Sequence, residues 1–166
     1  TTRLSSISEL VRRDLTPLQR QATFALLTSE VHNRDILGAL VAALAFSAAH
    51  EGTECFEWQK HLRYYWEPGE YIDLAEQQAA VTEQDLCIIR HLDNRYSYAF
   101  EYEGVASRLV ITPLTERCWL AITQASQMKK GTAVGGLAGT GKTETVKDLA
   151  KALAVLCFEF NCSDQL

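Results

Sequence analysis

The sequence predicts a mixed α and β fold: a helical N-terminal part that ends in a β-hairpin, followed by one strand–glycine loop–helix–strand unit. Three observations predict it. Apolar residues recur at helical spacing through much of residues 1–66. Alternation of apolar and polar residues replaces that spacing between residues 86 and 102. A glycine-rich loop at 136–143 then stands between a short apolar segment and an amphipathic helix.

Three helices are expected before residue 67. Thr16 and Pro17 form a suitable N-cap and first turn, and Asn33 is expected to cap a second helix. A third helix is predicted over Glu54–Trp66, ending before Pro68. The residues expected to face inward from the first two are Leu18, Ala22, Ala25, Leu26, Ile36, Leu37, Leu40, Val41 and Leu44.

A β-hairpin is expected next. Leu86–Leu92 and Arg95–Tyr102 are the two strands, and Asp93-Asn94 supply turn residues that tolerate positive φ. The second strand places four aromatic residues on one face, which could stack bases or pack a core. Packing is favoured because the chain is acidic overall and no cluster of Lys and Arg accompanies these residues. The four are Tyr96, Tyr98, Phe100 and Tyr102.

The remaining elements predict a βαβ unit. A helix should begin at Thr112-Pro113 and run to Gln127, with Leu114, Cys118, Ile122 and Ala125 facing inward. Thr132–Gly135 is predicted as a strand, the glycine loop leads into a helix with an apolar stripe, and Cys157–Cys162 is the following strand. That order implies a parallel strand pair with a right-handed crossover.

The glycine loop, Gly136–Thr143, fits the phosphate-loop pattern G-x-x-x-x-G-K-[ST] at every fixed position. Its glycines let successive N–H groups point inward as a nest for the β-phosphate, and the following helix adds its N-terminal partial positive charge. Lys142 can offset charge on the β- and γ-phosphates, and the Thr143 hydroxyl can occupy one position around Mg²⁺. Glu144 lies just beyond the loop and is expected to be solvated or helix-supporting.

Composition restricts the function classes. The 166 residues carry a formal charge of −5, which argues against a nucleic-acid surface. The five cysteines form no C-x-x-C pair, so a disulfide framework or zinc site is not expected and a reducing cytosolic compartment fits best. The apolar run 36–49 is shorter than the roughly 20 residues that cross a bilayer, and the N-terminus has no signal-peptide pattern, so no membrane contact is expected.

Hydrolysis requires groups beyond the phosphate loop. An acidic residue must hold Mg²⁺, another group must orient water, and an arginine often assists. Asp164 follows the last predicted strand, but four consecutive apolar residues do not precede it, which disfavours this role. The chain by itself is therefore expected to bind nucleotide without turning it over.

The residues resemble a known family. "TPLTERC", "AGTGKTETVKDL" and "FNCS" within Leu109–Leu166 look like the start of the first AAA+ module of dynein heavy chains. Upstream, "EVHNRD", "FEWQKHLRYYW" and "YSYAFEYEG" resemble the end of the dynein linker. Two features depart from the family pattern: Leu137 stands where most dyneins have proline, and the segment between Trp66 and Leu86 is longer than usual.

The resemblance implies a domain division and a function. Residues 1–105 would be the end of the linker and residues 106–166 the first part of an AAA+ ATPase module of a microtubule motor. ATP or ADP with Mg²⁺ would be the ligands, Lys142 the catalytic charge and Thr143 the Mg²⁺ ligand. The expected nucleotide contacts are Val110, Ile111, Gly136, Leu137, Ala138, Gly139, Thr140, Gly141, Lys142, Thr143 and Glu144, with Leu109 beside the adenine.

Partners and location follow from the same resemblance. The other AAA+ modules of the heavy chain, microtubules through a stalk, and intermediate and light chains through a tail are implied partners. "NCSDQL" resembles axonemal more than cytoplasmic heavy chains, which favours a cilium or flagellum. Two other interpretations stay open: a self-contained nucleotide-binding module of another P-loop family, and a helical interaction domain whose loop is vestigial.

Overall fold

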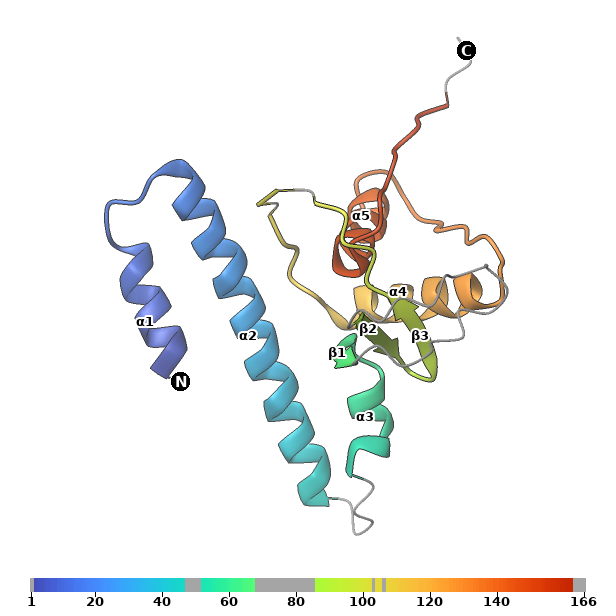
Figure 1. Ribbon diagram of the computed structural model, residues 1–166, viewed down its shortest axis with the longest axis horizontal. Coiled ribbons are helices and arrows are strands. Elements are labelled where there is room, and N and C mark those ends of the chain that lie inside the picture. Colours follow the sequence, from blue (N-terminus) through green and yellow to red (C-terminus); the bar gives the residue numbers. More distant parts are fainter. Residues whose placement is uncertain (1, 47–51, 68–85, 103, 106, 163–166) are drawn as a thin grey trace.

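The computed structural model describes residues 2–46, 52–67, 86–102, 104–105 and 107–162. A helical hairpin of α1 and α2 stands to one side of a body formed by a small sheet, α4 and α5 (Figure 1). No described helix is both long enough and apolar enough to cross a membrane. The elements, in chain order, are α1 (Thr2–Val11), α2 (Pro17–Phe46), a 3₁₀ turn (Gly52–Glu54), α3 (Phe56–Gln59), β1 (Arg63–Glu67), β2 (Leu86–His91), β3 (Asn94–Ser97), α4 (Pro113–Gln127) and α5 (Lys142–Leu153).

The start of α2 confirms the predicted cap. The Thr16 hydroxyl accepts the Gln19 N–H at 3.3 Å, and the Gln19 side chain accepts the Thr16 N–H at 3.0 Å. The predicted break at Asn33 is wrong, because α2 runs through it to Phe46. No Gly or Pro lies between Leu18 and Asn33 to interrupt the backbone hydrogen bonds, so Asn33 lies inside the helix with its side chain exposed.

Much of the predicted apolar face of α2 is exposed. Leu18, Leu37 and Val41 are 64%, 59% and 68% exposed, whereas Leu40 is buried. The apolar residues of α2 do recur at helical spacing. They are exposed because, within the described residues, only the short α1 and the edge of the body approach α2 (Figure 1). Spacing predicts a face and not its partner.

The predicted third helix is only partly correct. Its first residues form α3, but Arg63–Glu67 form strand β1 and pair antiparallel with β2, with Tyr65 opposite Ile88. Consecutive aromatic residues in "RYYWE" fit a pleated surface better than a helix. The segment 68–85 lies outside the described residues.

The predicted β-hairpin is present as β2 and β3, with Ile89 opposite Tyr96. Its turn is Leu92-Asp93, one residue earlier than expected, with φ of 52° at Leu92. Strand β3 ends at Ser97 instead of Tyr102, and Phe100 has a φ of 58°, which breaks the extended backbone. Because β2 is the central strand, both Ile88 and Ile89 are fully buried, one on each face of the sheet.

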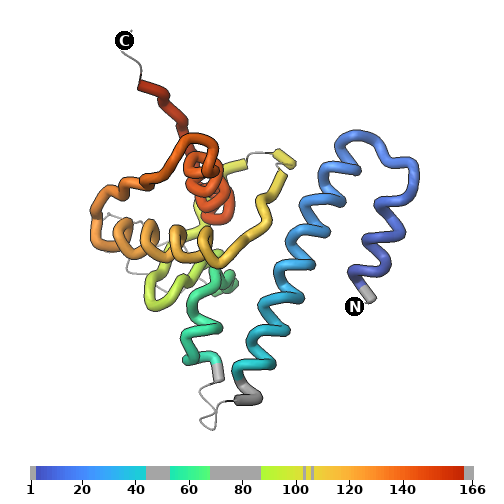
Figure 2. The backbone as a smooth tube through the Cα atoms, turned by 180° about the vertical axis from the view of Figure 1, so that it is seen from behind, coloured from blue at the N-terminus to red at the C-terminus, as the bar shows by residue number. Residues whose placement is uncertain are grey.

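Helix α4 has the predicted bounds and α5 follows the loop as predicted. Leu114, predicted to face inward from α4, is 77% exposed, because the buried face is formed by Trp119, which packs against α5, and Thr123, which contacts His91 of the sheet. The predicted parallel strands on either side of the glycine loop are absent. Residues 132–135 and 157–162 form no strand. The segment before the loop arcs away from α4, and the segment after α5 extends away from the body (Figure 2). Parallel strands are stable when hydrogen-bonded to neighbours and covered on both faces, and the described residues provide no such neighbours. The core between the two helices is Trp119, Leu149 and Ala152.

Candidate functional site

The glycine loop forms a compact turn that leads directly into α5. Gly139 and Gly141 have φ of 76° and 80°, in the left-handed region that favours glycine. Gly141 is the residue that precedes the first turn of α5, so the free backbone N–H groups of that helix end lie beside the loop. The turn thus combines the two features that bind anions at a helix N-terminus.

Lys142 folds back over the loop. Its Nζ donates hydrogen bonds to the carbonyl oxygens of Gly136 at 3.0 Å and Leu137 at 2.6 Å. The Thr140 hydroxyl donates to the same Leu137 carbonyl at 2.8 Å. The ammonium group is therefore already held above the loop, close to where a bound phosphate would need a positive charge.

Gly136 lies close to two side chains of the loop. A Cβ atom added there would lie 3.1 Å from the Thr140 hydroxyl and 3.6 Å from the Lys142 side chain. A side chain at this position would require the Thr140 hydroxyl to shift by a few tenths of an ångström. Lys142, Thr140 and the glycines of the loop are thus held together in one compact turn at the start of α5.

The other predicted residues of the loop lie at its surface. Thr143 is exposed in the first turn of α5, where its hydroxyl is free to meet a Mg²⁺ ion. Glu144 is also exposed and pairs with Lys147 at 3.5 Å, in keeping with a helix-supporting role. Leu137 is 82% exposed. Asp164 lies outside the described residues.

The residues predicted to line the adenine pocket differ in their exposure. Ile111 packs against the core of α4 and α5, whereas Val110 is 73% exposed. The segment lies beside Asp148 of α5, on whose carboxyl group Arg108 and the Leu109 backbone both act. Burial raises the pKa of Asp148, opposed by the charge of Arg108. The structure brings Leu109 and Ile111 beside α5 and leaves Val110 facing outward.

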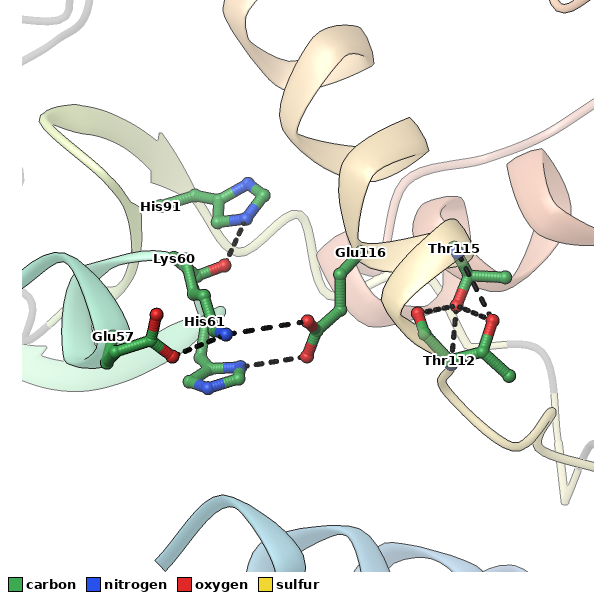
Figure 3. A network of polar contacts seen from close by, with 7 residues as sticks. All are labelled: Glu57, Lys60, His61, His91, Thr112, Thr115 and Glu116. Atoms are coloured by element: carbon green, nitrogen blue, oxygen red, sulfur yellow. Dashed lines mark hydrogen bonds and ion pairs between the residues drawn. The ribbon is translucent and has the colours of Figure 1, made fainter. Parts of the chain in front are cut away.

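A cavity of about 750 Å³ lies away from the glycine loop, between α2, the sheet, α4 and α5. Two histidines and a carboxylate line it: His32 on α2, His61 between α3 and β1, and Glu116 in the first turn of α4. The His61 Nδ1 atom lies 3.3 Å from Glu116 Oε1 (Figure 3). Sequence analysis missed this cluster because its members come from three distant segments and share no spacing.

Lys60 and His91 border the cluster. Lys60 Nζ contacts Glu57 at 2.6 Å and Glu116 at 3.9 Å (Figure 3). The buried His91 ring contacts the Thr123 hydroxyl at 2.8 Å and the Lys60 carbonyl at 2.9 Å. A carbonyl only accepts, so Nε2 carries the proton and donates to Lys60, and Nδ1 accepts from Thr123 when the ring is neutral.

Burial keeps His61 neutral. It lowers the pKa of His61 from 6.5 to about 4, and the charge of Lys60 adds to that shift. Burial also lowers the pKa of His32 and of His91. Acid should therefore destabilise the fold, because the unfolded chain takes up protons that the folded chain does not.

The free energy of unfolding is expected to fall as the pH drops from about 6.5 towards 4. After allowance for solvent screening, His61 contributes a loss of about 1 kcal/mol at pH 5 relative to pH 7. Urea unfolding at a series of pH values measures this slope. His61→Gln should reduce the slope, with His32 and His91 supplying the remainder; an unchanged slope in the variant would exclude His61 as its source.

The comparisons with known proteins agree with the geometry of the loop. Residues 98–166 match the family model described as the hydrolytic ATP binding site of the dynein motor region. The chain is 46% identical over 164 residues to human dynein axonemal heavy chain 6, covering 99% of this chain and 4% of that protein. It is 37% identical over 163 residues to the flagellar outer arm dynein beta chain of Chlamydomonas reinhardtii, covering 98% of this chain and 3% of that one. The chain thus spans only a small part of the length of these relatives.

Proposed function

Because this chain belongs to the dynein heavy-chain family, we propose that its residues 136–143 bind the phosphates of MgATP and that its N-terminal part transmits nucleotide state as the end of a linker. The closed glycine loop with Lys142 Nζ held above it is the observation that carries the first half of this proposal. The boundary between the linker part and the AAA+ part is proposed near residue 105. ATP hydrolysis and microtubule binding would belong to the whole protein. The axonemal relatives favour a location in a cilium or flagellum.

Each loop residue has a defined task in binding. The backbone N–H groups that follow Gly139 and Gly141 surround the β-phosphate, and Lys142 moves from the two carbonyls onto the β- and γ-phosphate oxygens. Thr143 would hold Mg²⁺, which neutralises phosphate charge when bound. Leu109 and Ile111, which lie beside α5, would contact the base.

Coupling to the N-terminal part is supported by hydrogen bonds at the far end of α5. The Ala152 carbonyl accepts the Tyr64 hydroxyl at 2.9 Å, and the Leu153 and Ala154 carbonyls accept the N–H groups of Ala99 and Glu101 at 3.2 and 2.9 Å. Twelve helical residues, about 18 Å, separate these bonds from the phosphate loop. A shift of α5 when phosphate binds would therefore move the sheet and the segment after it.

Calorimetric titration of the chain with MgATP, MgADP and adenosine tests the binding site. Both nucleotides should bind and adenosine should bind at least tenfold more weakly, because the loop contacts phosphates and only two apolar residues approach the base. Adenosine binding as tightly as ATP would refute a phosphate-directed site. No binding of any of the three would favour the interpretation that the loop is vestigial.

A further inference from the structure

The cavity beside α2 contains a group of side chains that nucleotide binding does not use. The candidate donor atoms of His32, His61 and Glu116 all lie within 4.8 Å of one another, and all three residues are half-buried. The two imidazole rings meet edge to face with centroids 6.2 Å apart. We propose that these three residues bind a divalent transition-metal ion of the Zn²⁺ type. The proposal is independent of the nucleotide site.

The spacing of the donors fits a tetrahedral ion. Zn²⁺ bonds of about 2.0–2.2 Å at tetrahedral angles place neighbouring donors roughly 3.3–3.5 Å apart. The contact between His61 Nδ1 and Glu116 Oε1 is already 3.3 Å. The remaining separations, at most 4.8 Å, would have to close by up to about 1.4 Å through rotation of His32 or Glu116, both of which line the cavity.

The charges around the cluster permit a cation. Lys60 is the nearest ammonium group, but it lies 2.6 Å from Glu57 and 3.9 Å from Glu116, so it retains a partner when Glu116 turns to the ion. The charges of Lys60 on His61 and of Arg108 on His32 both oppose a bound cation. Both imidazoles are kept neutral by burial, which leaves their nitrogen lone pairs available at neutral pH.

The donor set selects the class of metal. Two imidazole nitrogens and one carboxylate suit Zn²⁺ and its neighbours, whereas Mg²⁺ and Ca²⁺ require more oxygen ligands than this cluster provides. Three protein ligands leave a fourth position directed to the cavity, where water can complete the tetrahedron. The bound ion would connect α2, the segment between α3 and β1, and α4, three elements that otherwise meet through few contacts.

Cobalt(II) titration of the metal-free 166-residue chain tests the proposal, because Co²⁺ occupies Zn²⁺ sites and its visible absorption reports the ligands. We expect one equivalent to bind with tetrahedral d–d bands and without thiolate charge-transfer absorption, and Zn²⁺ to displace it. The thiolate band matters because all five cysteines are free thiols that could compete. A thiolate band, or octahedral spectra alone, would overturn the assignment.

Variants separate the cluster from its surroundings. His61→Ala, Glu116→Gln and His32→Gln should each weaken Co²⁺ binding at least tenfold. His32 lies on the long helix α2, which does not need that side chain to form, so His32→Gln is the variant least expected to disturb folding. Glu67→Gln is the matched control: it makes the same chemical change at a carboxylate that pairs with Arg90 and Arg95, away from the cluster and from Lys60, and should leave the affinity within about twofold. Far-UV circular dichroism checks that each variant is folded. Equal affinity in the three cluster variants and the parent chain would refute the site.

Discussion

Lys142→Ala is expected to weaken MgATP binding by about 10- to 100-fold, the range that follows from losing a charged hydrogen bond to phosphate. The structure gives the reason. Lys142 Nζ is held over the loop by the Gly136 and Leu137 carbonyls. Alanine keeps the helix, so the loss should fall on binding and not on folding.

Lys147→Ala is the matched control for this change. Lys147 lies on the same helix but pairs with Glu144 at 3.5 Å and Glu159 at 2.5 Å instead of the loop. Lys147→Ala removes one positive charge, as Lys142→Ala does, but it should change ATP affinity by less than about threefold. Calorimetric titration of the parent chain and both variants measures the difference. If the two variants weakened binding equally, Lys142 would be acting only through net charge and its proposed role would be withdrawn.

The phosphate loop and the β-hairpin could be predicted because the sequence patterns that specify them are local. Fixed positions such as Gly136, Gly141 and Lys142 encode backbone conformation and charge within eight residues, and the structure places them in one turn. The cap at Thr16 and the helix from Pro113 depend on neighbours three or four residues away. In each case the determining contacts lie inside the window from which the prediction was made.

The missed features depend on distant partners. Whether "RYYWE" becomes helix or strand is decided by its pairing with β2, about 20 residues later in the chain. The exposed leucines and valines of α2 and the segments around the glycine loop have apolar patterns whose partners are not among the described residues. The cluster of His32, His61 and Glu116 exists only after the chain has folded, and single-sequence spacing carries no signal for it.

Trp119→Ala is the change expected to cost the most stability, about 3–5 kcal/mol of the free energy of unfolding. Trp119 is 5% exposed at the centre of the core between α4 and α5, against Leu149 and Ala152. Its indole N–H also donates to the Thr145 carbonyl at 3.0 Å. Alanine removes both the buried aromatic surface and this bond, and it leaves a cavity that two crossing helices cannot easily close.

Trp66→Ala provides the comparison, since the same side chain is deleted from a position that is 64% exposed and the expected loss is about 1 kcal/mol or less. Urea denaturation of both variants measures the two values, and similar losses would contradict a core centred on Trp119.

The loss of Trp119 should also affect the phosphate loop. Thr145 receives the indole hydrogen bond through its carbonyl and donates from its hydroxyl to the Gly141 carbonyl at 2.9 Å. Trp119 therefore fixes the first turn of α5, and Trp119→Ala should weaken ATP binding even under conditions where the variant remains folded.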